Sequence, residues 1–165
     1  SWRGGGAPIL PAVSLETTDS GQRLWVHAPA VAERVGFASA LDLHLRDLGE
    51  ALCVGPQWLP LLPEALAEAA AFQVGKSQAA LSVLLELSAE GELLHYRFCR
   101  STIKPNALVD DGALEALAER KPKARTTPAA LKSLKDHLPL LEQLISLAGL
   151  LRSNGVPVGK MDYLG

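Results

Sequence analysis

Residues 24–66, LWVHAPAVAERVGFASALDLHLRDLGEALCVGPQWLPLLPEAL, carry the pattern that decides the fold. The first residues alternate between an apolar side and a mixed side, as in a strand: Leu24, Val26 and Ala28 face one way, Trp25 and His27 the other. Pro29 has no N–H for sheet pairing, so the strand should end there. The chain should then turn into a short segment, Val31 to Val35.

A helix is expected next in this stretch. Ser39 can cap its N-terminus with Asp42 three residues later, and leucines recur at helical spacing at positions 41, 45, 48 and 52. The helix should end between Gly49 and Leu52, followed by an extended, proline-punctuated segment from Gly55 to Pro63.

The chain on either side of this stretch predicts two hairpins and several more helices. Residues 12–17 and 22–28 should pair across a turn at residues 19–21. Alternating apolar residues at 81, 83, 85 and 87 and at 94, 96 and 98 should pair across Glu90 and Gly91. Helical patterns cover residues 63–72, 114–119, 128–137 and 140–152. We therefore expect an α/β (α+β) fold, with a mixed or antiparallel sheet and helices packed mainly on one side.

The order of these motifs resembles a known family. VSLE at 13–16, LWVHxxxVAxxV at 24–35, LD at 41–42 and LPLLPEAL at 59–66 precede AALSVLLEL at 79–87 and EGELLHYRFCRSTI at 90–103. This string resembles the first half of the RNB domain of the ribonuclease II and ribonuclease R exoribonucleases, over roughly residues 8–108 and more weakly to Gly159. The resemblance implies a single-strand-specific, Mg²⁺-dependent, 3′-to-5′ RNA hydrolase. Residues 1–7 would be a flexible lead-in, and 8–165 a single RNB-like domain or part of one.

The sequence departs from the family where the chemistry should lie. The RNB pattern holds magnesium with aspartates just before its Ala-Val-Ser strand, and those positions are Pro8, Leu10 and Pro11 here. Neither proline nor leucine offers the hard anionic oxygen that fixes the ion and its water. The resemblance also places Ala30 at a usual aspartate, Gln78 at a usual arginine, and Cys53 and Asp111 at usual tyrosines. The pattern therefore indicates a fold that was kept and an active site that was given up.

Composition limits the possible functions. The hydrophobic fraction of 48% and charged fraction of 21% are ordinary for a globular protein. A net charge of −2 argues against binding polyanions through overall charge, so only a local basic patch could bind RNA. No apolar run reaches the roughly 20 residues of a membrane span. Cys53 and Cys99 lack zinc or disulfide spacing, which favours reduced thiols in the cytoplasm or an organelle stroma or matrix.

Three other local patterns are weaker indications of chemistry. Gly75, Lys76 and Ser77 look like the end of a phosphate-binding loop, but they precede a predicted strand, not a helix. Asp110 and Asp111 stand where a helix should begin, which favours capping over metal binding. The four histidines, at positions 27, 44, 95 and 137, lie in different predicted elements and form no metal-binding pair.

A basic segment is the strongest candidate site. It contains six cations with no acidic residue between Glu119 and Asp136: Arg120, Lys121, Lys123, Arg125, Lys132 and Lys135. Such a segment can present several charges to a phosphate backbone, although charge runs are usually solvated surface.

The leading hypothesis is a degenerate, hydrolytically inactive exoribonuclease homologue without a cofactor, which binds single-stranded RNA or a protein of RNA decay. One alternative is an active nuclease fragment that uses Mg²⁺ with ligands from another chain or from misaligned residues. A second is a scaffold protein that does not bind RNA. Leucines and an isoleucine ring residues 138–151 on more than one face, so we also expect a protein partner or a second copy to cover Leu138–Leu164.

Overall fold

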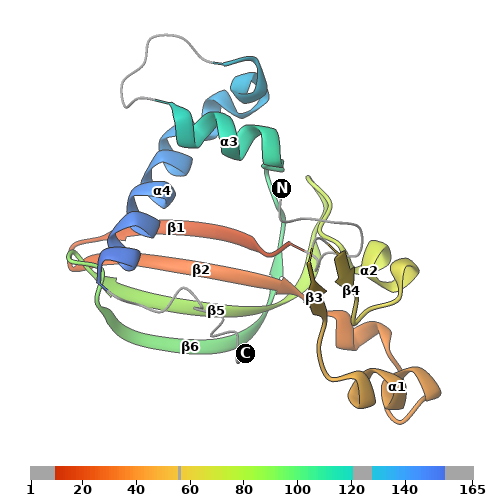
Figure 1. The fold of residues 1–165 in the computed structure, drawn as a ribbon. Helices are drawn as coiled ribbons and strands as arrows, with labels where there is room; N and C mark the ends of the chain where they lie inside the picture. The colour runs from red at the N-terminus through yellow and green to blue at the C-terminus, as the bar shows by residue number, and fades with distance from the viewer. Residues whose placement is uncertain (1–9, 56, 121–127, 155–165) are drawn as a thin grey trace. The chain divides into compact units, whose positions relative to one another are not determined.

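The computed structural model describes residues 10–55, 57–120 and 128–154 (Figure 1). Along the chain, its elements are β1 (Ala12–Thr18), β2 (Gly21–Pro29), the 3₁₀ helix η1 (Val31–Arg34), α1 (Ala40–Leu48), β3 (Leu52–Val54), β4 (Gln57–Leu59), α2 (Glu64–Ala70), β5 (Gln78–Ser88), β6 (Leu93–Ile103), α3 (Asp111–Glu119), the 3₁₀ helix η2 (Ala129–His137) and α4 (Leu138–Ser153). The predicted α/β class with an antiparallel sheet is confirmed.

The main sheet has the strand order β1-β2-β5-β6 (Figure 1). Short turns make β1–β2 and β5–β6 antiparallel hairpins. Two contacts show that β2 and β5 are also antiparallel. Just after the end of β2, the N–H of Ala30 donates to the carbonyl of Ala79 near the start of β5, at 3.2 Å. At the start of β2, Gly21 lies against the carbonyl of Leu87 near the end of β5.

The chain divides into two compact units, and each of the four long strands contributes to both. Unit 1 comprises Val26–Val83, Phe98–Asn106 and the described residues up to Val13. Unit 2 comprises Ser14–Trp25, Leu84–Arg97 and the described residues from Ala107 onward.

Unit 2 contains an apolar core between three helices. Leu131 and Leu134 of η2 are 0% and 3% exposed and pack with Leu117 of α3 and Leu138 of α4. The Asp110 carboxylate caps α3 by accepting from the N–H of Ala113 at 2.8 Å, so the expected capping role is confirmed. The shared leucine cluster explains why α3, η2 and α4 fold together.

Unit 1 is stabilised by helix caps, by a short hairpin and by a few small buried side chains. Ser39 caps α1 by accepting from the N–H of Asp42, as expected, and Gly49 ends the helix with a φ of 74°. The segment from Gly55 to Pro63, expected to be extended, contributes strand β4, which pairs with β3 just before it. The buried apolar residues of this unit in the described chain are Ala70 and Ala80.

Several local expectations are shifted in the structure. The helix expected from residue 140 begins at Leu138, and residues 129–137 form a 3₁₀ helix. Within β5 the more buried side chains are Ala80, Ser82 and Leu84, followed by Leu87, whereas Leu81 is 50% exposed. The apolar alternation at 81, 83 and 85 thus predicts the strand but not the side that is covered.

The partner predicted to cover Leu138–Leu164 is not supported by the described part of this region, Leu138–Asn154. Leu138 and Leu147 are 7% and 5% exposed, and the other leucines of α4 are half-buried. Ile145, at 43%, is the one large apolar side chain of α4 among the exposed ones. Within the chain, η2 and α3 pack against Leu138 and Leu141 of this helix. The burial of these leucines within the chain therefore removes the reason to expect a partner over α4. Residues 155–164 lie outside the described chain.

Gly21 generates the first prediction. Its φ is 149°, and a Cβ there would lie 2.0 Å from the Leu87 carbonyl oxygen. We expect Gly21→Ala to lower the free energy of unfolding by about 1–3 kcal/mol, because backbone cannot move aside as a flexible side chain can. Urea denaturation followed by circular dichroism measures the change.

Gly149→Ala is the matched control. An added Cβ there meets nothing within 4 Å, and the residue lies inside α4. This variant should be stabilised by about 0.5–1 kcal/mol. Equal stability of the Gly21→Ala variant and the wild type would show that β2 does not need this close approach.

Candidate functional site

The residues before β1 stand where the resemblance expects metal ligands. β1 begins at Ala12, preceded by the half-buried Leu10 and the exposed Pro11. Pro8 lies outside the described residues. In the described ranges, no three His, Cys, Asp or Glu side chains come together as a metal site.

The other positions at which this chain departs from the family pattern lie in caps, connections and strands of the fold. Ala30 precedes η1, and its N–H bonds to Ala79. The Gln78 amide accepts from the N–H of Gln73 at 2.6 Å and donates to the Ala71 carbonyl at 3.0 Å, so it closes the connection between α2 and β5. Asp111 is the first residue of α3, and Cys53 is exposed on β3.

The basic segment is only partly described. Lys121, Lys123 and Arg125 lie outside the described residues. Lys132 and Lys135 are exposed on η2. Side chains three apart eclipse on a 3₁₀ helix, at about 2.0 Å rise per residue, so the two ammonium groups project in one column. The adjacent column, Leu131 and Leu134, fills the core and fixes the outward direction of the lysines.

Arg120 differs from the two lysines. Its guanidinium forms an ion pair with Glu142 of α4, and its side chain is only 12% exposed. This pair links the end of α3 to α4 within unit 2. The geometry therefore gives Arg120 a structural contact, while Lys132 and Lys135 point their charges into solvent.

A hydrogen-bonded row crosses three strands of unit 1. His27 Nδ1 on β2 lies 2.7 Å from Ser82 Oγ on β5, and Ser82 Oγ lies 2.6 Å from Ser101 Oγ on β6. Ser82 is fully buried, so no substrate reaches its hydroxyl as it would a nucleophile. The sequence analysis did not predict this row. Ser82, a lone polar residue in the apolar run of β5, could have indicated a buried hydrogen bond.

Burial lowers the pKa of His27 below its ordinary value of 6.5, because the low-dielectric interior disfavours the charged imidazolium. The ring is therefore neutral at pH 7. If the proton is on Nδ1, the ring donates to Ser82 Oγ. If it is on Nε2, Nδ1 accepts a hydrogen bond from the Ser82 hydroxyl.

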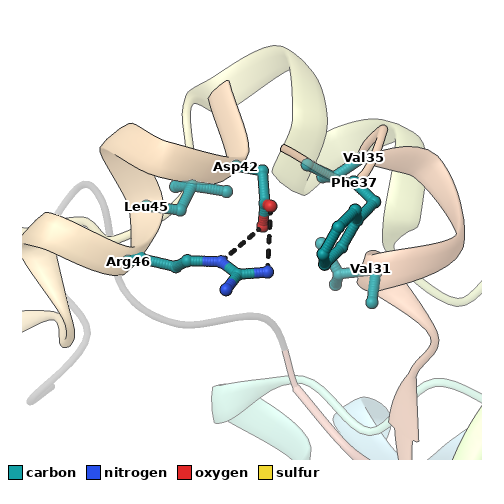
Figure 2. A pocket seen from close by; sticks show the side chains of 7 residues that line it. Val31, Val35, Phe37, Asp42, Leu45 and Arg46 are labelled. Atoms are coloured by element: carbon teal, nitrogen blue, oxygen red, sulfur yellow. Dashed lines mark hydrogen bonds and ion pairs between the residues drawn. The ribbon is translucent and has the colours of Figure 1, made fainter. Parts of the chain in front are cut away.

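Figure 2 shows a pocket of about 330 Å³ between η1 and α1, with apolar walls that include Val31, Val35 and Leu45. Arg46 donates to both carboxylate oxygens of Asp42, at 3.1 and 3.0 Å. Its guanidinium also lies 5.4 Å from the ring centroid of Phe37. The Arg46 hydrogen bond, with a further one from the Ala38 N–H, holds the pKa of Asp42 below its ordinary value. Because Arg46 and Asp42 bind each other, neither charge is available to a ligand. The rest of the pocket wall is mainly apolar, so the pocket fits an apolar group better than a catalytic role.

A family model described as the RNB domain matches residues 7–160 of the chain. A comparison with curated proteins gives no match. None of the helices within the described ranges has the length and apolar content to span a membrane.

Three similar solved structures share this fold. Ribonuclease R of Mycoplasma genitalium with ribose-methylated single-stranded RNA has a TM-score of 0.69 at 16% identity, over 88% of this chain and 22% of that one. The same enzyme with double-stranded RNA has a TM-score of 0.65 at 17% identity, over 88% and 25%. Yeast Ssd1, described as a pseudonuclease, has a TM-score of 0.65 at 20% identity, over 88% and 16%. The chain thus spans about a quarter or less of the length of these proteins.

The buried histidine generates the second prediction. Its pKa is lower folded than unfolded, so below about pH 6.5 the unfolded chain binds more protons. The free energy of unfolding should therefore fall as the pH drops through 6.5 toward the folded pKa, and His27→Gln should remove this part of the dependence. Urea denaturation at pH 5 and pH 8 measures both slopes. His44→Gln, at an exposed position of α1, controls for loss of an imidazole. Equal slopes for the wild type and the His27→Gln variant would contradict the assignment.

Proposed function

This chain belongs to the RNB domain family, and from that premise we propose that it is a hydrolytically inactive member that binds single-stranded RNA. The observation that carries the proposal is the pair of residues directly before β1. The resemblance places the family's magnesium-holding aspartate pair there, and this chain has Leu10 and Pro11.

The chemistry of those two residues supports inactivity. Metal-dependent phosphodiester hydrolysis needs anionic oxygens that fix the ion and lower the pKa of its bound water. Leucine and proline side chains supply no oxygen. Residues 12–18 form strand β1. The first carboxylate after Pro11 is Glu16, which lies inside that strand and not directly before it.

RNA binding is supported by the relatives and by η2. Ribonuclease R of Mycoplasma genitalium is solved with single-stranded and with double-stranded RNA, and yeast Ssd1 is described as a pseudonuclease, so loss of hydrolysis is compatible with this fold. In this chain, the outward column of Lys132 and Lys135 provides two adjacent charges for a phosphate backbone. The proposal also includes three cations of the same segment that lie outside the described residues: Lys121, Lys123 and Arg125.

Two alternatives predict different outcomes. An active nuclease with Mg²⁺ ligands from another chain would shorten RNA when that chain is present. A scaffold protein, which binds a protein or a second copy, would neither shorten nor bind RNA. A protein partner in RNA decay remains part of the proposal, as does a cytoplasmic or organelle location.

The third prediction is the absence of hydrolysis. Labelled single-stranded RNA incubated with the purified chain and Mg²⁺ or Mn²⁺ should keep its length, because no ligand pair precedes β1. Denaturing gel electrophoresis measures the length, with an active ribonuclease R as positive control and a mock purification as blank. Shortening above the blank that EDTA abolishes would overturn the proposal.

The fourth prediction concerns the lysines of η2. A Lys132→Glu, Lys135→Glu double variant should weaken RNA binding evenly across sequences, because phosphate contacts carry no base information. Each phosphate contact on a single strand contributes about 0.7 to the slope of log K against log salt, so the slope should become shallower by about 1.4. Fluorescence anisotropy over a salt series measures both effects.

A matched control reverses the same amount of charge elsewhere. Arg34 and Lys76 are exposed in unit 1, so an Arg34→Glu, Lys76→Glu variant changes the net charge equally. If both double variants lose affinity and slope alike, overall charge governs binding and η2 is not the contact.

A further inference from the structure

The pocket between η1 and α1 has apolar walls that the described chain leaves open. Its volume of about 330 Å³ lies at the lower end of the range for ligand pockets, roughly 300 to 1,000 Å³. Val31 and Val35 lie on one side and Leu45 on the other (Figure 2), and all three are half-buried. None of the residues of α1 is buried. The pocket therefore keeps apolar surface in water, and a ligand that covered this surface would be stabilised.

Phe37 stands at the mouth of this pocket, next to a strained residue. Its side chain is 88% exposed, and Figure 2 shows the ring beside Val31 and opposite Arg46. The next residue, Ala38, has a φ of 56°, in the left-handed region that alanine rarely adopts. The Asp42 carboxylate accepts from the Ala38 N–H at 2.8 Å and so fixes this conformation. Strained backbone of this kind clusters at functional sites, which favours a binding role for the exposed ring.

The polar wall of the pocket is fixed and nearly neutral. Arg46 donates to both carboxylate oxygens of Asp42, and its guanidinium lies 5.4 Å from the ring centroid of Phe37. Because the two charges neutralise each other, this wall neither attracts nor repels a charged ligand strongly. The charges around the pocket therefore decide which ligand fits.

The exposed charges at the C-terminal end of α1 are acidic. Asp47 lies in the last turn of the helix and Glu50 follows it, and both are exposed. The negative end of the helix dipole lies at the same place and adds to their field. At the other side of the pocket, on η1, Glu33 is paired with Arg100, and Arg34 is exposed. A cation is therefore attracted to the α1 end of the pocket, and a phosphate is repelled from it.

This combination fits a short segment of a protein better than a nucleic acid or a small apolar molecule. A base could contact Phe37, but its phosphates would meet the carboxylates at the end of α1. A small apolar molecule would fill the pocket and leave those carboxylates unused. A peptide with one large apolar side chain and a lysine or arginine nearby uses both features. Exposed aromatic rings and arginines beside a pocket are also typical of protein interfaces.

We propose that the η1–α1 pocket docks a short segment of a protein partner, which inserts one large apolar side chain beside Phe37 and places a lysine or arginine near Asp47 and Glu50. All residues of this site belong to unit 1. The proposal goes beyond RNA binding, because the site contains no residue of the basic segment 120–135. Docking of the partner and binding of RNA can therefore be tested separately.

The test selects ligands from a phage-displayed library of random decapeptides on the full chain, after depletion on an Ala32→Leu variant. Ala32 lines the pocket and is exposed, so a leucine there fills the pocket without entering a core. The enriched peptides should combine one large apolar residue with a lysine or arginine a few positions away. No enrichment, or enriched peptides without an apolar residue, would overturn the proposal.

The enriched peptide, labelled with fluorescein, is then titrated with variants that played no part in its selection. Phe37→Ala should weaken binding by about tenfold or more, because a central aromatic residue of an interface carries much of the affinity. Asp47→Lys should weaken it about two- to fivefold, and less at high salt, because the attraction between exposed charges is screened. Equal binding of the wild type and the Phe37→Ala variant would contradict the site.

Two positions on α3 provide matched controls. Ala118 and Glu115 are exposed there, in unit 2. Ala118→Leu adds the same bulk as Ala32→Leu, and Glu115→Lys changes the net charge as Asp47→Lys does, so both should bind the peptide like the wild type. Thermal unfolding checks that each variant is folded. If a pocket variant is unfolded, a peptide with benzoylphenylalanine at its apolar position is crosslinked to the wild type: adducts within residues 31–46 support the site, and adducts confined elsewhere overturn it.

The remaining outcomes separate this proposal from its competitors and from RNA binding. If Phe37→Ala weakens the binding of an oligouridylate tenfold and no peptide is enriched, the pocket holds a base and the proposal is wrong. If Phe37→Ala converts a sedimenting dimer to a monomer, the pocket docks a second copy and the proposal is also wrong. If the wild type binds no RNA but the peptides behave as expected, the RNA-binding function is wrong and this docking site stands.

Discussion

The pairing of β2 with β5 is the constraint on which the rest of the structure depends. These strands are separated by about fifty residues, which contain η1, α1, the β3–β4 hairpin and α2. The Ala30–Ala79 hydrogen bond fixes one end of the pairing, and the close approach of Gly21 to the Leu87 carbonyl fixes the other. Joining distant strands costs loop-closure entropy, which the ladder and the buried His27–Ser82 bond offset. The two local hairpins, β1–β2 and β5–β6, become one sheet only through this pairing.

The two units are stabilised by different kinds of contact. In unit 2, buried leucines from α3, η2 and α4 pack into an apolar cluster, and Arg120 bonds to Glu142 at its edge. In unit 1, the buried groups of the described chain are small or polar, so caps, turns and hydrogen bonds carry more of the stability. Large apolar side chains of unit 1, including Phe37 and Val54, are exposed.

The contacts that stabilise the described elements lie away from the residues directly before β1. The contacts that hold the described elements use leucines, small residues, caps and a neutral histidine. Among the described residues, none of these contacts uses a carboxylate directly before β1. Surface charge is also independent of the core: on η2, one column of side chains is buried while the next column points outward.

Features that depend on residues close together in the chain could be predicted from the sequence. Alternation predicted β2, β5 and β6, Ser39 and Asp110 predicted their caps, and the ordered motifs predicted the family. Packing decided the rest, because burial depends on residues distant in sequence. Only long-range packing buried Ser82 while exposing Leu81, packed Leu138 of α4 against η2 and α3, and bound Arg120 to Glu142. It also brought His27 beside Ser82 and Ser101, because β2 pairs with β5 across about fifty residues of sequence.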